Sequence, residues 1–575
     1  MARVMIVLIT FLTLFISPSV SPQDFSSLTI MPLVSAQSYS MLDPRPYDPA
    51  VDPNSDLFIS SWQQATPYQL YGSLTVQDIL TPCDGDPIHP KAKGAVLTNF
   101  KRFAHGTLSP GASTKPSKLS GEQIVFYIAS GKGTIKAGKK TADLHDGVGV
   151  LLPPGIEFTM RNTGDIPLTM YIISEPVPSG FKPEKEMLVH DEHSMPLDST
   201  NGHWCHIFTR LFMQEDGLAT IVGMGSVWFD PMTMGQPHSH SEGVEEIWFV
   251  LEGDVNLLLG KHMMKLSPGS AYKIPSTGVS VHSNINVTDK PVKLFWFMKI
   301  PPTTTYPDYS MLAPEPFDPV KDVNIDMFMG SYLESSPHHT HGSLLERDIL
   351  TLGDPMNPPS RAAVLSFVNR FTHATLMPNN ATLPVVLKGE QEIFFIISGK
   401  GVISAGTKTA NLSPGITVLM PANLEFTMKN TGDEPLTMYL AAEPYPEGFR
   451  LNTEMTVVDE STQPIAPSSG HWHGDVRMLL TTADGLGTLE SILTCEFHPM
   501  DFFHPHSHFK GTEEVWTTIN DEIHVLLGKK PRLQPAGTAY LIPPDGKTPH
   551  ANFNVSDKPV KMFYFARYRD HEVRK

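Results

Sequence analysis

A chain of 575 residues is long enough for several domains, and its formal net charge of −17 argues against the basic surface that nucleic-acid binding requires. Hydrophobic residues make up 40% of the sequence, which is enough for several packed cores and atypical of a disordered chain. Its three cysteines cannot form a disulfide framework, so apolar burial has to stabilise the fold.

The N-terminus has the pattern of a signal peptide. Arg3 provides a positive charge, residues 4–16 are an apolar run of 13 that is short for a membrane span, and Ala36 ends a small-residue cleavage sequence. We expect residues 1–36 to be a signal peptide that is removed, and the mature protein to be secreted or periplasmic with no further membrane association. An uncleaved anchor is the alternative.

The remainder of the chain consists of two similar halves. The tripeptide at residues 40–42 recurs at 310–312, and later positions match at an offset of 268, which aligns His238 with His506. A repeat of this kind indicates a duplicated architecture. The halves span residues 37–302 and 303–575.

Each half is itself double. The pattern Asn-x-x-Asp-x-Pro, followed by apolar residues, occurs four times, beginning at Asn162, Asn286, Asn430 and Asn554. Four equivalent markers in one chain indicate four copies of one module. We predict modules one to four at residues 37–181, 182–302, 303–449 and 450–575.

Each module has the composition of a β-structure. Residues 124–138, 246–260 and 392–406 are rich in Ile, Val and aromatic residues and are interrupted by glycine, as strands joined by tight turns are. No long segment has the 3.6-residue apolar period of a helix, and the 52 prolines and 42 glycines favour many short strands. The sequence therefore predicts an all-β protein of barrels or sandwiches.

Modules two and four each contain a set of metal-ligating residue types. In module two, His238 and His240 are two residues apart, so on a strand both side chains point to the same face. Glu245 or Glu246 follows, and His282 returns from a later strand. Three imidazoles and one carboxylate suit Mn, Fe, Ni, Co or Zn and leave positions open for water or substrate. Module four repeats the set as His506, His508, Glu513 or Glu514, and His550.

These blocks, a His-x-His followed by glutamate and then a Pro/Gly turn followed by His and Asn, resemble the two motifs of the cupin superfamily. The resemblance implies four cupin barrels (double-stranded β-helices, or jelly rolls) arranged as two bicupin halves. Asp521 replaces the glycine that follows the first block in the family, so the turn in module four is expected to differ.

The resemblance leaves a choice between adjacent glutamates. The family spacing favours Glu245 and Glu513. Counting back along the strand from the turn at Gly253 favours Glu246, and the same count favours Glu514. We expect Glu246 and Glu514 to be the ligands, because strand register is harder to shift than loop length.

Modules one and three lack such a set. Module one has no histidine where the first block should lie, and Phe158 and Phe426 stand where His282 and His550 stand in the other modules. Apolar rings at these positions pack a barrel interior rather than bind a cation. We expect modules one and three to be structural partners that pack against modules two and four.

We predict up to two divalent metal ions per chain and a metal-dependent enzyme of the dioxygenase, decarboxylase, isomerase or hydrolase type, acting on a small polar or sugar-derived substrate. The alternative is a non-catalytic ligand-binding or storage-type bicupin, similar to the seed globulins. Whether the chain forms a homo-oligomer is open.

The two predicted sites are not identical in sequence. Three residues near the ligands differ: Phe249, Val250 and Gln236 in module two become Thr517, Thr518 and His504 in module four. We expect a more polar pocket in module four, with an activity that responds to pH in the histidine range.

Overall fold

The computed structural model describes residues 38–39, 42–199, 203–204, 206–301, 312–315, 317–467 and 471–568. The predicted signal peptide, residues 1–36, lies outside these ranges. The described residues form short strands and 3-10 turns, which confirms the all-β prediction. None of their helices has the length and hydrophobicity of a membrane span. The 3-10 turns are η2 (Ser55–Phe58), η3 (Trp62–Gln64), η4 (Glu192–Ser194), η5 (Gln214–Asp216), η6 (Ile325–Phe328), η7 (Tyr332–Glu334), η8 (Glu460–Thr462) and η9 (Thr482–Asp484).

Barrels 1 to 4 are numbered after the modules that form most of each barrel. Barrels 1 and 3 have the same pair of sheets around an apolar core. The larger sheet of barrel 1 comprises β14 (Leu188–Asp191), β11 (Val148–Leu152), β8 (Glu122–Ser130), β13 (Leu168–Pro176), β6 (Arg102–Leu108), β4 (Leu74–Pro82), β3 (Tyr68–Leu70) and β5 (Ala95–Leu97), and the smaller one β10 (Lys140–Leu144), β9 (Gly133–Ala137), β12 (Glu157–Asn162) and β7 (Ser117–Lys118). The corresponding strands of barrel 3 are β37 (Thr456–Asp459), β34 (Ile416–Met420), β31 (Glu390–Ser398), β36 (Leu436–Pro444), β29 (Arg370–Leu376), β27 (Leu344–Leu352), β26 (His338–Thr340) and β28 (Ala363–Leu365), with β33 (Lys408–Leu412), β32 (Gly401–Ala405), β35 (Glu425–Asn430) and β30 (Val385–Val386). Phe158 and Phe426, which replace the ligand histidines, are each 1% exposed in these cores.

Barrels 2 and 4 carry the predicted ligands. Barrel 2 consists of β15 (Leu197–Ser199), β16 (Ile207–Met213), β17 (Gly223–Phe229), β24 (Val292–Lys299), β19 (Glu245–Glu252), β22 (Ser270–Lys273) and β2 (Ile59–Ser61), with β18 (Thr233–Met234), β23 (His282–Asn286), β20 (Val255–Leu259) and β21 (His262–Leu266). Barrel 4 consists of β38 (Ala466–Pro467), β39 (Asp475–Thr481), β40 (Ser491–Phe497), β47 (Val560–Arg567), β42 (Glu513–Thr518), β45 (Thr538–Leu541) and β25 (Met329–Ser331), with β44 (Lys530–Gln534), β43 (Ile523–Leu527) and β46 (His550–Phe553). A further pair joins β1 (Ser38–Tyr39) to β41 (Ser507–His508).

The barrels of one half exchange edge strands across the expected boundary between their modules. β2 belongs to the first module by sequence but pairs with β22 of barrel 2, and β14 belongs to the second module but pairs with β11 of barrel 1. β25 and β37 repeat the exchange in the second half. Exchange covers sheet edges that would otherwise be unpaired, which is a physical reason for it.

The two barrels of each half also share an apolar core. In the first half the rings of Phe103 and Tyr171, from barrel 1, contact Phe249 of barrel 2 at centroid distances of 5.6 and 4.0 Å. Phe371 and Phe563 contact each other in the second half. The two barrels of each half are therefore packed against each other through aromatic side chains.

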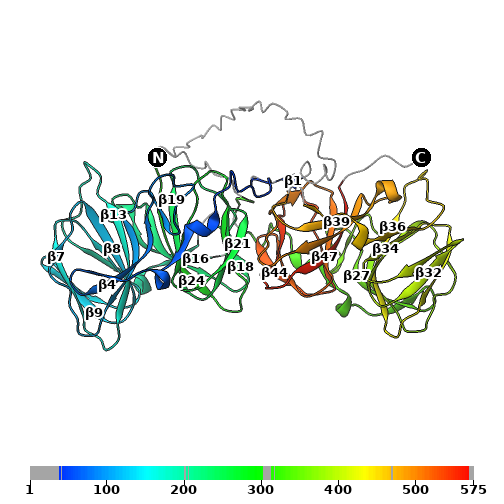
Figure 1. Ribbon diagram of the computed structural model, residues 1–575, viewed down its shortest axis with the longest axis horizontal. Coiled ribbons are helices and arrows are strands. Elements are labelled where there is room, and N and C mark those ends of the chain that lie inside the picture. Colours follow the sequence, from blue (N-terminus) through cyan, green and yellow to red (C-terminus); the bar gives the residue numbers. More distant parts are fainter. Residues whose placement is uncertain are drawn as a thin grey trace, which may run out of the picture.

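The four barrels lie in a row, with barrels 1 and 3 at the two ends and barrels 2 and 4 meeting in the middle (Figure 1). An apolar cluster crosses this contact and includes Trp204 and Leu258 of barrel 2 together with Trp472 and Leu526 of barrel 4. The predicted metal-binding barrels are thus neighbours in space although they are 268 positions apart in sequence.

Candidate metal centres

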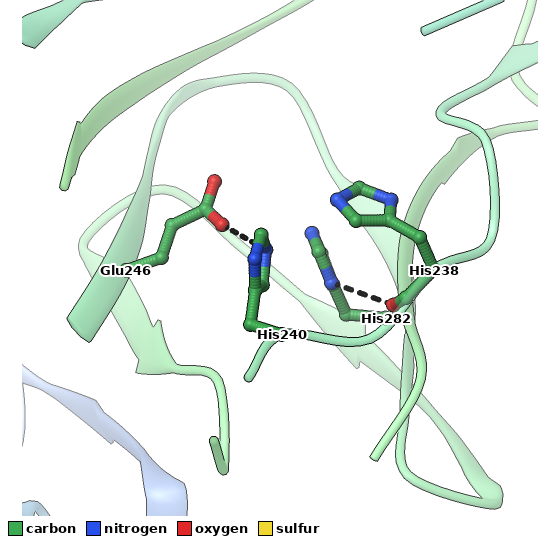
Figure 2. Close-up of side chains that lie close together, drawn as sticks. All are labelled: His238, His240, Glu246 and His282. Atoms are coloured by element: carbon green, nitrogen blue, oxygen red, sulfur yellow. Dashed lines mark hydrogen bonds and ion pairs between the residues drawn. The ribbon is translucent and has the colours of Figure 1, made fainter. Parts of the chain in front are cut away.

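In barrel 2 the structure brings the predicted residues together. His238 forms an isolated bridge with His282, which begins β23, and Glu246 comes from β19. One ligand atom from each of His238, His240, Glu246 and His282 lies within 4.8 Å of the others, and all four side chains are buried. Figure 2 shows the three imidazoles close together, with the carboxylate of Glu246 next to His240.

The adjacent glutamates have different environments. Glu246 forms an ion pair with His240. The carboxylate of Glu245 is directed to barrel 1, where it accepts hydrogen bonds from the backbone N–H of Thr98 (2.7 Å) and Asn99 (2.6 Å). Glu513 likewise accepts from the backbone N–H groups of residues 366–368 in barrel 3. The structure therefore directs the alternative carboxylates, Glu245 and Glu513, away from the histidines, because consecutive strand residues face opposite sides.

Backbone carbonyls orient the imidazoles of barrel 2. Nδ1 of His238 donates to the carbonyl of Gln236 (2.8 Å), and Nδ1 of His282 donates to the carbonyl of His238 (3.1 Å; Figure 2). These bonds fix the tautomer and leave Nε2 for the centre.

Charge states in barrel 2 suit a cation. Burial, together with neighbouring histidines, lowers the pKa of His238 and of His282 well below the usual value, so both rings are neutral at pH 7. Burial alone would raise the pKa of Glu246, but His240 outweighs it by charge and hydrogen bonding and lowers the pKa to about 2. Neutral imidazoles and an ionised carboxylate are the forms in which these side chains bind metals.

Two tryptophans hold the carboxylate of Glu246. Nε1 of Trp248 donates to Oε1 at 2.9 Å, and Nε1 of Trp296 donates to the same oxygen. Neither tryptophan was predicted from the sequence to be part of the site. Trp248 lies two positions after Glu246, on the same face of β19, which is a signal that could have identified it.

In barrel 4 the three histidines cluster in the same way. Ligand atoms of His506, His508 and His550 lie within 4.8 Å of one another. Glu514 lies beside this group, with its Oε2 at 3.1 Å from Nε2 of His508 and its Oε1 at 3.8 Å from Nε2 of His550. The predicted fourth ligand is therefore present at the second centre, although it is less closely placed than Glu246.

The surroundings of Glu514 are more polar than those of Glu246. Trp516 donates to its Oε1 at 2.7 Å, as Trp248 does in barrel 2. The hydroxyl of Tyr564, at the position of Trp296, donates to its Oε2 at 3.4 Å, and that of Tyr568 donates to the same oxygen at 2.8 Å. Neither tyrosine was predicted from the sequence to be part of the site. No local pattern marked them, because Tyr564 of β47 and Tyr568, which follows the end of that strand, lie 50 and 54 residues beyond Glu514.

The substitution of His504 for Gln236 does not add a group that titrates in the histidine range. Burial lowers the pKa of His504 to about 3, so the ring is neutral at physiological pH. The expectation that His504 would confer a pH response in that range is therefore wrong, since a buried imidazolium would lack the solvation that water gives to the charged form.

A comparison with models of protein families gave matches in three of the four modules. The model of the cupin domain family matches residues 104–174, 226–298 and 373–442. No curated protein matches the chain.

Partial matches to solved structures were also found. They include a putative glyoxylate induced protein from Pseudomonas aeruginosa (16% identity, 46% of this chain and 96% of that one, TM-score 0.35). Another is oxalate decarboxylase from Bacillus subtilis, which has Mn(II) centres (11%, 42% and 77%, TM-score 0.33). The protein Ylba from E. coli is a third (16%, 42% and 98%, TM-score 0.31).

Proposed function

We propose that this chain, which is a multi-cupin protein of the cupin superfamily, binds two divalent transition-metal ions, in barrels 2 and 4, and acts as a metal-dependent enzyme. The observation that carries the proposal is the convergence of three imidazoles and one carboxylate within 4.8 Å in barrel 2. That donor set fits Mn, Fe, Ni, Co or Zn. His238, His240, Glu246 and His282 would hold one ion, and His506, His508, Glu514 and His550 the other.

A metal held by these four side chains would supply a Lewis acid for a substrate oxygen. The protein's own residues provide the rest of the site. The carbonyl of Gln236 keeps Nε2 of His238 facing inward, and the two indoles keep Glu246 in place. All of these groups are buried or half-buried, which limits the access of water.

The barrel interior favours a small polar or sugar-derived substrate. The hydroxyl of Tyr272 donates to Asn284 at 3.0 Å, and Asn284 lies two residues after His282, on the same face of β23. Tyr540 and Asn552 repeat this pair in barrel 4 at 3.0 Å. The bond between the tyrosine and the asparagine uses only part of the hydrogen-bonding capacity of this buried pair, so the remaining amide N–H groups and hydroxyl lone pairs favour a substrate that offers hydrogen-bonding groups.

The test begins with metal analysis of protein purified from its native host, followed by assays of hydroxy acids, sugar acids and dicarboxylates with the reloaded protein. Oxygen consumption, released CO2 and product structure separate the dioxygenase, decarboxylase, isomerase and hydrolase types. Tight binding of substrates without turnover would favour the alternative, a non-catalytic binding or storage protein. Absence of any bound metal would refute the proposal.

The N-terminal pattern supports a secreted or periplasmic protein. N-terminal sequencing of the protein from its host tests this, with Gln37 as the expected first residue. Retention of Met1 or Ala2 as the first residue would contradict it.

A further inference from the structure

Each half of the chain begins with a segment that crosses to the other half. Arm 1 comprises the described residues 38–39 and 42–43 and lies on barrel 4, where β1 pairs with β41. Arm 2 comprises residues 312–313 and lies on barrel 2. Leu42 and Leu312 are 2% and 3% exposed, and both belong to the apolar cluster between the two barrels. The arms are therefore built into the contact between the halves.

Arm 2 is bound by the two residues that precede the first ligand of barrel 2. Nε2 of Gln236 donates to the carbonyls of Leu312 and Ala313, both at 2.9 Å. The backbone N–H of Leu312 donates to the carbonyl of Pro237 at 3.1 Å. Trp204 adds a hydrogen bond from Nε1 to Ala313 at 3.2 Å.

Arm 1 makes the corresponding contacts on barrel 4. Nε2 of His504 donates to the carbonyl of Leu42 at 3.4 Å, and Nε1 of Trp472 donates to that of Asp43 at 2.8 Å. His504 and Trp472 are the repeat equivalents of Gln236 and Trp204. In addition, β1 pairs with the strand that contains His508.

Arm 1 is also tied to its own half. The carboxylate of Asp43 accepts a hydrogen bond from Lys261 of barrel 2 at 2.9 Å, and Lys261 is 5% exposed. Ala313 stands at the equivalent position of arm 2 and cannot form this pair. Arm 1 thus bridges barrels 2 and 4 through both its side chain and its backbone.

The residue that anchors each arm also orients a ligand. The side chain of Gln236 binds arm 2, while its carbonyl accepts the Nδ1 proton of His238 at 2.8 Å. The side chain of His504 binds arm 1, while its carbonyl accepts the Nδ1 proton of His506 at 2.8 Å. Such outer hydrogen bonds orient the rings that bind metals and affect metal affinity.

We propose that Gln236 and His504 are positioning residues through which the arm of one half holds the first histidine of the metal centre in the other half. Each centre is then completed by a segment from the opposite half of the chain. The inference rests on the proposed function only in that the positioned group is a metal centre.

The test uses the full chain with one centre removed at a time. His550→Ala leaves the centre of barrel 2, and His282→Ala leaves that of barrel 4. Leu312→Ala or Leu42→Ala is added to each background, and the release of Co²⁺ to a chelator is followed by its visible absorption. Leu352→Ala, at a leucine that is 57% exposed, is the matched control.

Leu312→Ala should accelerate Co²⁺ release from barrel 2 by about tenfold, as expected for loss of an outer support, and leave barrel 4 unchanged. Leu42→Ala should do the reverse. Gln236→Leu should match Leu312→Ala, and the double variant should be no faster, because both substitutions loosen the same arm. Unchanged release, equal effects at both centres, or effects of Leu312→Ala and Leu42→Ala that are confined to the half carrying the substitution would overturn the inference.

If the proposed function is wrong, the unsubstituted chain should not bind Co²⁺. In that case the role of the arms is tested by amide hydrogen exchange of the metal-free protein. Leu312→Ala should then raise exchange in residues 236–240 and not in 504–508. Equal exchange in both segments would overturn the role of the arms.

Discussion

Glu245 and Glu246 are consecutive residues of β19, and their carboxylates lie on opposite sides of that strand. Glu246 faces His240 inside barrel 2, whereas Glu245 accepts hydrogen bonds from the backbone of Thr98 and Asn99 in barrel 1. Because side chains alternate along a strand, Glu246 faces the interior of barrel 2 while Glu245 binds the backbone of barrel 1. Glu514 and Glu513 repeat the relationship.

The different environments of Glu245 and Glu246 predict different effects for substitutions of the two residues. Glu246→Gln should abolish binding of the ion in barrel 2, because a neutral amide is a poor metal ligand. Glu245→Gln should retain the ion but lower the free energy of unfolding by about 1–3 kcal/mol, since an amide N–H would face backbone N–H donors. Metal analysis and urea unfolding of the two variants measure these effects. Loss of the ion in Glu245→Gln alone would reverse the assignment.

The number of ions is a second prediction. Native mass spectrometry should detect two ions per chain, and His240→Ala and His508→Ala should each remove one while the circular dichroism spectrum is preserved. The fold should survive because packed barrels, rather than the metal, provide most of its stability. A count of zero or four ions, or unfolding of either variant, would contradict this.

The two hydroxyls at Glu514 should contribute unequally. Tyr568 donates to the carboxylate at 2.8 Å and Tyr564 at 3.4 Å, so Tyr568→Phe should weaken Co²⁺ binding in barrel 4 more than Tyr564→Phe does. We expect a loss of affinity of about tenfold for the former. Titration in the His282→Ala background measures it. Equal affinities for the two variants would show that the hydroxyls do not support the carboxylate.

Barrel 3 contains a buried ion cluster that predicts a pH-dependent stability. Nε2 of His341 lies 3.0 Å from Glu392, near Glu346 and Arg370, whereas barrel 1 has Tyr71 at the equivalent position. Burial lowers the pKa of His341, but Glu392 and Glu346 outweigh this and raise it above the ordinary value of 6.5.

A histidine pKa that is raised by folding stabilises the folded state below the unfolded pKa, and the stabilisation is lost as pH rises through the folded pKa. The thermal stability of the parent chain should therefore exceed that of His341→Gln most strongly below pH 6.5, and the difference should shrink at higher pH. Tyr71→Phe in barrel 1 is the control. The difference in thermal stability between the parent chain and this variant should not vary with pH over the same range. A gap between parent and His341→Gln that is constant with pH would contradict the prediction.

The class of fold and the positions of the candidate ligands could be predicted from the amino-acid sequence alone. The repeat of 268 residues, the strand-rich segments and the absence of a helical period are local or periodic properties, which a sequence displays directly. The spacing of His238 and His240 also places both rings on one face, since residues two apart on a strand share a face.

Only the tertiary structure decided which neighbours these residues meet. Period-two alternation separates Glu245 from Glu246 but does not say which of the two faces the histidines. That depends on the loop of barrel 1 that supplies backbone N–H donors 146 and 147 positions away. The same holds for Trp296, for Tyr568 and for the arms at Leu42 and Leu312. Their contacts join residues that are distant in sequence, and such contacts are fixed by the packing of whole barrels rather than by any local pattern.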